Sequence, residues 1–154
     1  MISETPIHWY GLPDLRDGSI DLKQWGPIPV ESWHARSMLR LSPTSMTKMI
    51  AGDLVDTGWF FGRERILLGS LPQTARCFYI EQLFMPDTIH ESQNYLYAQS
   101  DIRAALGISP KTIYNKVNTG RMVREMLPNG GFRYPHWGME EGMAIKVREL
   151  YLNS

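Results

Sequence analysis

One pattern occurs twice in this chain, 67 positions apart, and this duplication constrains the fold more than any other feature. Residues 35–55 read ARSMLRLSPTSMTKMIAGDLV, and residues 102–123 read IRAALGISPKTIYNKVNTGRMV. Ser42-Pro43 falls on Ser109-Pro110 at this spacing, and one extra residue in the later copy then brings Gly52 onto Gly120. Self-similarity of this kind marks a duplicated structural unit. We therefore expect two copies of one small module, a pseudo-dimer within one chain.

Each copy carries the signals of two short helices joined by a tight turn. Apolar residues at helical spacing define one face of each predicted helix in the second copy: Ile102, Ala105 and Leu106, then Ile113 and Val117. Gly107 is suited to the chain reversal, and Ser109 with Pro110 is a helix start signal. In the first copy Arg40 stands where the second has Gly107. Both copies predict a helix-turn-helix.

Extended segments flank the helices of both copies. Residues 28–30 and 95–97 predict short strands just before the first helix of each copy. Residues 122–127 and 132–134 are separated by Pro-Asn-Gly-Gly, a strong hairpin signal, so a wing follows the second helix-turn-helix. Residues 139–152 have apolar residues at helical spacing and predict a closing helix.

The end of the first copy is ambiguous in the sequence. The run from Cys77 to Phe84 is partly aromatic and β-branched, which favours a strand pairing back on residues 66–68. A helix is the alternative, because Glu81, Gln82 and Leu83 have no strand preference.

The order of strand, two helices, wing and helix resembles the winged domain of MerR-type regulators and phage excisionases. The resemblance covers residues 95–151 and, less fully, residues 28–83. The duplicated form also looks like the double helix-turn-helix DNA-binding accessory proteins of conjugative plasmids. These resemblances imply an α+β fold of two winged helix-turn-helix modules joined by antiparallel strands. We expect an N-terminal arm over residues 1–27, a first repeat over 28–84, a linker over 85–94 and a second repeat over 95–154.

Charge is distributed unevenly along a chain whose net charge is zero. From residue 103 to residue 133 a series of cations faces the single acid Glu125; they are Arg103, Lys111, Lys116, Arg121, Arg124 and Arg133. The first repeat is more balanced, with Arg36, Arg40, Lys48, Arg63 and Arg65 against Asp53, Asp56 and Glu64. A basic stretch around a helix-turn-helix is the electrostatic pattern of a nucleic-acid-binding protein.

These features predict a double-stranded-DNA-binding protein, acting as a regulator or architectural factor. Its predicted contacts in the second repeat are Lys111, Thr112, Asn115, Lys116, Thr119, Arg121 and, in the wing, Arg133. The corresponding contacts in the first repeat are Thr44, Ser45, Thr47, Lys48 and, beyond the helix, Arg63. If both helices enter successive major grooves of one duplex, the target is a pair of unlike half-sites.

The alternative function is a protein-interaction or assembly module that keeps the helix-turn-helix fold without binding DNA. Zero net charge and an excess of aromatic residues support it, and Trp59, Phe60 and Phe61 suggest a surface for a protein partner. Both a monomer with internal pseudo-two-fold symmetry and a homodimer are compatible with the sequence. For the core we expect burial of Leu39, Met46 and Ile50, and of Leu106, Ile113 and Val117.

Other classes of site lack the residues they need. The histidines His8, His34, His90 and His136 are scattered without metal-ligand spacing, and no phosphate-binding glycine loop occurs. We therefore expect no enzymatic activity, cofactor or metal. Cys77 is the only cysteine, which excludes an internal disulfide and suits a reducing compartment. With neither a membrane-length apolar run nor a signal peptide pattern, the sequence predicts a soluble cytoplasmic protein without a membrane partner.

Overall fold

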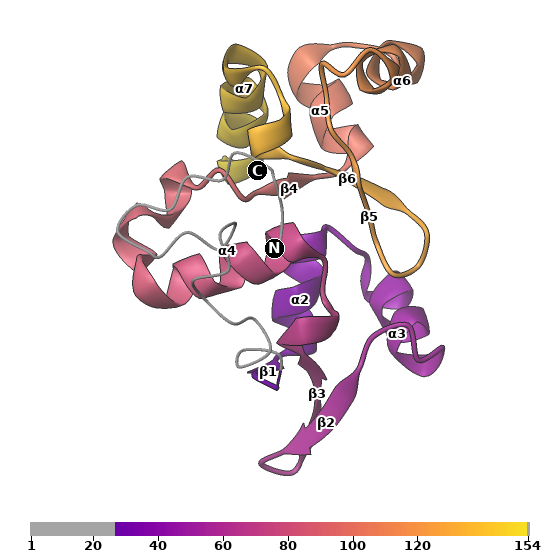
Figure 1. Cartoon of the computed structure of the whole chain (residues 1–154), viewed down its shortest axis with the longest axis vertical. Helices are drawn as coiled ribbons and strands as arrows, with labels where there is room; N and C mark the ends of the chain where they lie inside the picture. The colour runs from indigo at the N-terminus through magenta and orange to yellow at the C-terminus, as the bar shows by residue number, and fades with distance from the viewer. Residues whose placement is uncertain (1–26, 154) are drawn as a thin grey trace.

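The computed structural model describes residues 27–153, and it has an α+β fold in which one order of elements occurs twice (Figure 1). The first repeat consists of β1 (Pro29–Val30), α2 (Ser32–Leu39), α3 (Pro43–Ala51), β2 (Thr57–Phe60), β3 (Arg63–Leu67), the 3-10 turn η2 (Leu68–Ser70) and α4 (Gln73–Phe84). The second consists of β4 (Leu96–Tyr97), α5 (Gln99–Leu106), α6 (Pro110–Asn118), β5 (Glu125–Met126), β6 (Phe132–Pro135), η4 (His136–Gly138) and α7 (Glu141–Leu152). The 3-10 turn η3 (Pro86–Glu91) lies between them. The expected N-terminal arm, apart from Pro27, lies outside the described residues.

The two repeats correspond element by element. The helices before the hairpin begin and end 67 positions apart, and α4 and α7 begin and end 68 positions apart. The extra residue of the second repeat therefore lies in the hairpin between β5 and β6, and the expected alignment of Gly52 with Gly120 is wrong. Asp53 occupies the place of Gly120, and both have a left-handed backbone, with φ of 55° and 77°.

The turn between the two helices has the same geometry in both repeats. Arg40 ends α2 with φ 55°, and Gly107 ends α5 with φ 65°. An arginine therefore holds a conformation that glycine adopts without steric cost. The side chains of Ser42 and Ser109 cap α3 and α6, accepting hydrogen bonds from backbone N–H groups at 3.1 Å and 3.2 Å.

Each repeat has its own small antiparallel sheet. The strand orders are β1-β3-β2 and β4-β6-β5, and the registers match, with Val30 opposite Ile66 and Tyr97 opposite Tyr134. Within residues 27–153 no ladder joins the two sheets, so the expected strands linking the modules are not formed. Residues 77–84 belong to α4 rather than to a strand, which makes the helical alternative correct. Ala75, Phe78 and neighbouring turns of α4 are buried, and helical periodicity satisfies the backbone there.

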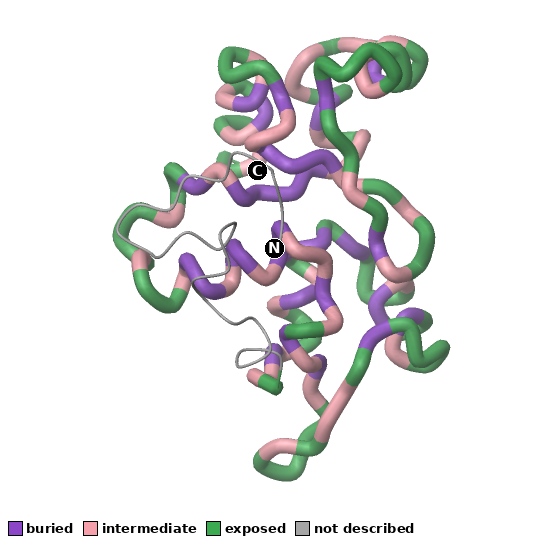
Figure 2. The backbone as a smooth tube through the Cα atoms, viewed as in Figure 1, coloured by how far each residue is buried: buried purple, intermediate pink, exposed green. Residues whose placement is uncertain are grey.

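The buried residues of both repeats form one continuous hydrophobic core, seen as purple segments on both sides of the repeat junction in Figure 2. Leu39, Met46 and Ile113 are buried as expected. The other three expected core residues are only partly buried and pack against that core; they are Ile50, Leu106 and Val117. No helix among the described residues has the length and apolar character needed to cross a bilayer.

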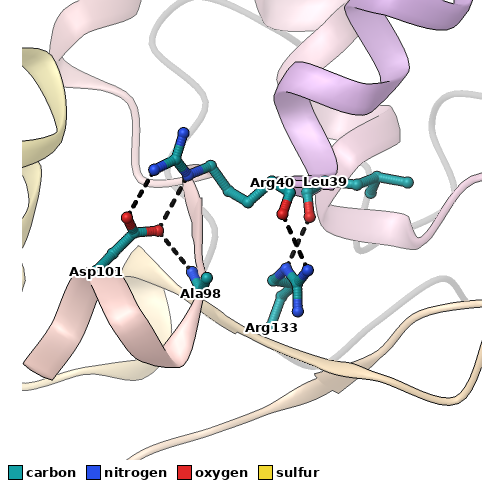
Figure 3. Close-up of polar contacts among 5 residues, drawn as sticks. All are labelled: Leu39, Arg40, Ala98, Asp101 and Arg133. Atoms are coloured by element: carbon teal, nitrogen blue, oxygen red, sulfur yellow. Dashed lines mark hydrogen bonds and ion pairs between the residues drawn. The ribbon is translucent and has the colours of Figure 1, made fainter. Parts of the chain in front are cut away.

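The repeats are joined by contacts between positions that do not correspond. Arg40, at the end of α2, forms a bidentate pair with Asp101 near the start of α5, at 3.0 Å and 2.6 Å (Figure 3). A two-fold relation would pair Gly107 with His34 in the same way, but His34 hydrogen-bonds Gln82 at 2.8 Å. The junction therefore does not follow the expected two-fold symmetry.

A second contact joins α4 of the first repeat to the hairpin of the second. The carboxylate of Glu125 in β5 accepts hydrogen bonds from the backbone N–H of Thr74, at 3.1 Å, and from its hydroxyl, at 2.5 Å. A carboxylate from the second repeat thus binds free N–H groups at the start of α4, where the helix dipole favours negative charge.

Candidate nucleic-acid interface

The outer face of α6 carries polar side chains directed away from the core. Ile113 is fully buried and Val117 is partly buried, which fixes the orientation of the helix. The opposite face consists of the exposed residues Lys111, Tyr114, Asn115 and Asn118. Lys111 and Asn115 were predicted from the sequence, whereas Tyr114 and Asn118 were missed. Their spacing of three and four residues was the available signal, because such positions share one helix face.

The two threonines predicted at this site lie at its ends. Thr112 is half-buried in the first turn of α6, where its hydroxyl lies 3.1 Å from that of Ser109. Thr119 is exposed just after the helix, and its hydroxyl donates to the carbonyl of Asn115 at 2.9 Å. Arg121 is exposed beside it and donates from Nε to the Thr119 hydroxyl at 3.2 Å.

Lys116 does not belong to the outer face of α6. Its side chain is only 15% exposed, and its Nζ lies 3.7 Å from the Glu140 carboxylate. Lys116 is three residues after Ile113, so helix geometry places it toward the buried side. The expectation of an exposed Lys116 is wrong, and its charge is neutralised within the second repeat.

Arg133 is also committed to the fold. Its Nε donates to the carbonyl of Leu39 at 2.7 Å, and one terminal nitrogen donates to the carbonyl of Arg40 at 3.0 Å (Figure 3). Its other terminal nitrogen donates to its own neighbour, Phe132, at 2.7 Å. Burial lowers the pKa of the guanidinium. The side chain binds carbonyl groups at the end of α2, so it joins the repeats instead of extending from the wing as expected.

Four cations of the second repeat remain exposed around the α6 face, and among the described residues none has an ion-pair partner: Arg103, Lys111, Arg121 and Arg124. The nearby acids are turned elsewhere, since Glu125 binds Thr74 and Asp101 binds Arg40. Folding therefore makes this face more basic than the sequence shows. In the wing, the Arg124 guanidinium lies 3.9 Å over the ring of Phe132.

The α3 face of the first repeat is polar but carries little charge. Thr44, Thr47 and Lys48 are exposed, and Ser45 is half-buried. Thr47 turns its hydroxyl back to the carbonyl of Pro43 at 2.9 Å. Lys48 is therefore the exposed charge of the predicted set on this helix.

The wing arginines of the first repeat are paired. Glu31 accepts from Arg63 at 2.9 Å and from Arg65 at 2.7 Å. The pKa of the Glu31 carboxyl is lowered, chiefly by the hydrogen bond from Arg65. Arg63, which was predicted to touch DNA, thus has an acidic partner within its own repeat.

The structure brings the two helices and one wing to the same edge of the molecule. In Figure 1, α6, the β5–β6 hairpin and α3 follow one another along one side, whereas α7 and α4 lie toward the other. The junction of Arg133 with Leu39 and Arg40 fixes the second wing beside the start of α3. These elements form one extended polar and basic edge.

No alternative catalytic or metal centre emerges within residues 27–153. No cluster of histidine, cysteine and acidic residues is arranged to hold a metal ion there. Cys77 is fully buried, and burial raises the pKa of its thiol, which opposes formation of the thiolate. His136 is buried and lies 2.7 Å from the Tyr97 hydroxyl through Nδ1. No family model, curated protein or solved structure matches this chain.

Proposed function

We propose that this protein binds double-stranded DNA through two winged helix-turn-helix modules, with α6 as the principal recognition helix. One observation carries the proposal: the exposed face of α6 combines Lys111, Tyr114, Asn115 and Asn118 with surrounding unpaired arginines. A helix that ends a tight turn and exposes amide and cationic groups suits a major groove, which is wide enough to admit it.

The side chains on α6 divide into those that position the protein and those that read bases. Arg103, Arg121 and Arg124 surround the helix and suit phosphate contacts, which supply affinity without sequence information. Asn115 and Asn118 suit bidentate contacts to adenine, and Lys111 suits guanine acceptors. Tyr114 offers an apolar ring to a thymine methyl group.

The first repeat makes the weaker contribution in this proposal. Lys48 is the exposed cation of α3, and the wing arginines are neutralised by Glu31. Because α3 and α6 lie at one edge of the molecule, a single duplex can meet both (Figure 1). Their exposed faces differ, since Lys111 and Tyr114 occupy the places of Thr44 and Thr47. The site would then be two unlike half-sites.

A charge reversal on α6, with a matched control on α7, tests the proposal. Lys111→Glu should weaken binding to a mixed-sequence duplex and reduce the slope of log affinity against log salt by about 0.9 for each phosphate that the variant no longer neutralises. Lys146→Glu makes the same change on the exposed surface of α7 and should leave both quantities unaltered. Fluorescence anisotropy at several salt concentrations measures both. Equal behaviour of the two variants contradicts DNA binding by α6.

A second pair of variants separates base reading from phosphate binding. Asn115→Ala should reduce the preference for one base pair by about 1–3 kcal/mol, measured on duplexes that differ at single positions. Arg121→Ala should weaken binding to every duplex by the same factor. If wild-type protein binds no duplex at low salt, the alternative of a protein-assembly module replaces this proposal.

A further inference from the structure

The hairpin between β2 and β3 holds an aromatic residue at its tip in an unfavourable backbone conformation. Phe61 has φ of 52° and is 95% exposed, and the next residue, Gly62, has φ of 80°. Two-residue turns with positive φ at both positions prefer asparagine, aspartate or glycine first, because a bulky side chain is strained there. The fold therefore does not account for a phenylalanine at this position, since the ring packs on nothing that offsets the strain.

A second aromatic side chain lies on the same hairpin. Trp59 is 74% exposed and stands opposite Glu64 in the ladder, so both side chains point to one face. Asp56, just before β2, is also exposed. We call Trp59, Phe61 and Glu64 together the aromatic knob. Figure 1 shows this hairpin projecting away from the rest of the molecule.

A groove elsewhere on the molecule has the complementary character. It encloses about 340 Å³ between the start of α4 and the second wing. Its lining includes the apolar side chains of Val123, Met126 and Trp137 and the guanidinium of Arg124. Its wall also contains Gln73, whose buried Nε2 has no hydrogen-bond partner among the described residues. The groove thus offers an apolar floor, a cation and an unused donor.

We propose that the aromatic knob of one chain occupies this groove of a second copy, so that the protein self-associates head to tail. An aromatic ring can rest on the apolar floor, and a ring close to the Arg124 guanidinium gains a cation–π interaction. Glu64 and Asp56 bring negative charge toward Arg124 and the nearby Arg121. The knob and the groove lie on different parts of the chain, so this contact is heterologous and leaves a free knob and a free groove at the two ends.

Charge favours a protein partner over DNA at the knob. Glu31 neutralises the arginines of this hairpin, and Glu64 and Asp56 add exposed negative charge. Phosphates would repel such a surface. The groove is basic, and a second copy of the chain supplies both halves of the contact. Self-association needs no DNA, so its test is independent of the function proposed above.

Two variants disable one half of the contact each. Phe61→Gly removes the knob and also relieves the positive φ, so it should fold at least as stably as the wild type. Met126→Glu places a carboxylate in the groove at a position that is 63% exposed, which spares the core. Wild-type protein without DNA should form dimers and larger species as concentration rises, measured by sedimentation velocity. Each variant alone should raise the dissociation constant by at least about tenfold, as truncation of a central interface residue does.

Mixing the two variants distinguishes this contact from a symmetric one. Phe61→Gly retains its groove, and Met126→Glu retains its knob, so the mixture should form a one-to-one dimer and nothing larger. A mixture that stays monomeric while wild type associates overturns the proposal, because it indicates knob-to-knob pairing. Wild-type protein that stays monomeric at all accessible concentrations also overturns it. If Phe61→Gly then weakens duplex binding, the knob contacts DNA instead.

Discussion

The two repeats have the same order of elements and the same strand register, yet their arginines have different partners. Arg65 in β3 and Arg133 in β6 occupy equivalent positions. Glu31 binds Arg65 within the first repeat, whereas the place of Glu31 in the second repeat is taken by Ala98. Without an acid beside it, Arg133 crosses to the carbonyls of Leu39 and Arg40.

This difference shows how duplication produced two surfaces from one fold. In the second repeat the structural contacts consume Lys116 and Arg133 but also turn Glu125 and Asp101 away, which leaves a basic α6 face. In the first repeat the wing arginines are neutralised, and aromatic side chains are exposed. The fold is common to both, and the pairing of a few side chains decides what each surface can bind.

The largest effect is expected from truncating the core at matched positions. Ile113 and Met46 occupy equivalent places and are both buried. Ile113→Ala and Met46→Ala should each lower the free energy of unfolding by about 2–5 kcal/mol. Since one core runs through both repeats, chemical denaturation should show a single transition in both variants. Two separate transitions would show that the repeats unfold independently.

Acid should destabilise the second repeat through His136. Burial, helped by Arg148, lowers the pKa of His136 from 6.5 to about 4. Between these values the unfolded chain binds a proton that the folded chain does not, so stability falls as pH drops from 6.5 toward 4. The loss should reach on the order of 2–3 kcal/mol.

The first repeat supplies the design of the matching variant, since Leu68 stands in the place of His136. His136→Leu combined with Tyr97→Phe removes the titrating ring together with the hydroxyl that contacts it. Denaturation midpoints measured across this pH range should then depend less on pH than in wild type. An unchanged dependence would assign the acid sensitivity to other groups.

A smaller effect of opposite sign is expected at Glu81. Burial raises the pKa of its carboxyl, while hydrogen bonds from Ser92 and Asn94 act against that shift. Above its unfolded pKa the free chain has lost the proton that the folded chain still holds, so stability from this group falls as pH rises. Glu81→Gln should remove that fall, as measured by urea denaturation between acid and neutral pH. Glu149, the exposed equivalent in α7, is the control, and Glu149→Gln should leave the dependence unchanged.

The smallest effect on stability, with a clear effect on binding, is expected from Glu31→Ala. Exposed ion pairs contribute little to folding, so thermal stability should change only slightly. The substitution frees Arg63 and Arg65, and the salt slope of duplex binding should steepen by up to about 0.9 for each further phosphate that these arginines neutralise. Glu64→Ala removes the same charge without freeing either arginine. If both variants give equal slopes, the pairing with Glu31 does not limit the first repeat.

The sequence predicted most of the local structure because its signals are local. Ser42 and Ser109 cap their helices, and the residues between β5 and β6 form the expected hairpin. It misplaced residues 77–84, where an apolar and aromatic run has no clear period and burial on most sides of α4 removes the usual pattern. Arg40 shows that a turn can be kept without its glycine when other contacts hold it, here the pairing with Asp101.

By itself, the sequence determined that the chain contains two similar units, that each carries two capped helices and a hairpin, and that cations gather in the second. Only the tertiary structure decided which of those cations remain free. Lys116 and Arg133 are indistinguishable from Lys111 and Arg121 in the sequence, because the partners that engage them are remote: Glu140 for one, and carbonyl groups 93 and 94 positions away for the other. A charge is available to a partner only when folding leaves it exposed and unpaired, and distant contacts decide that.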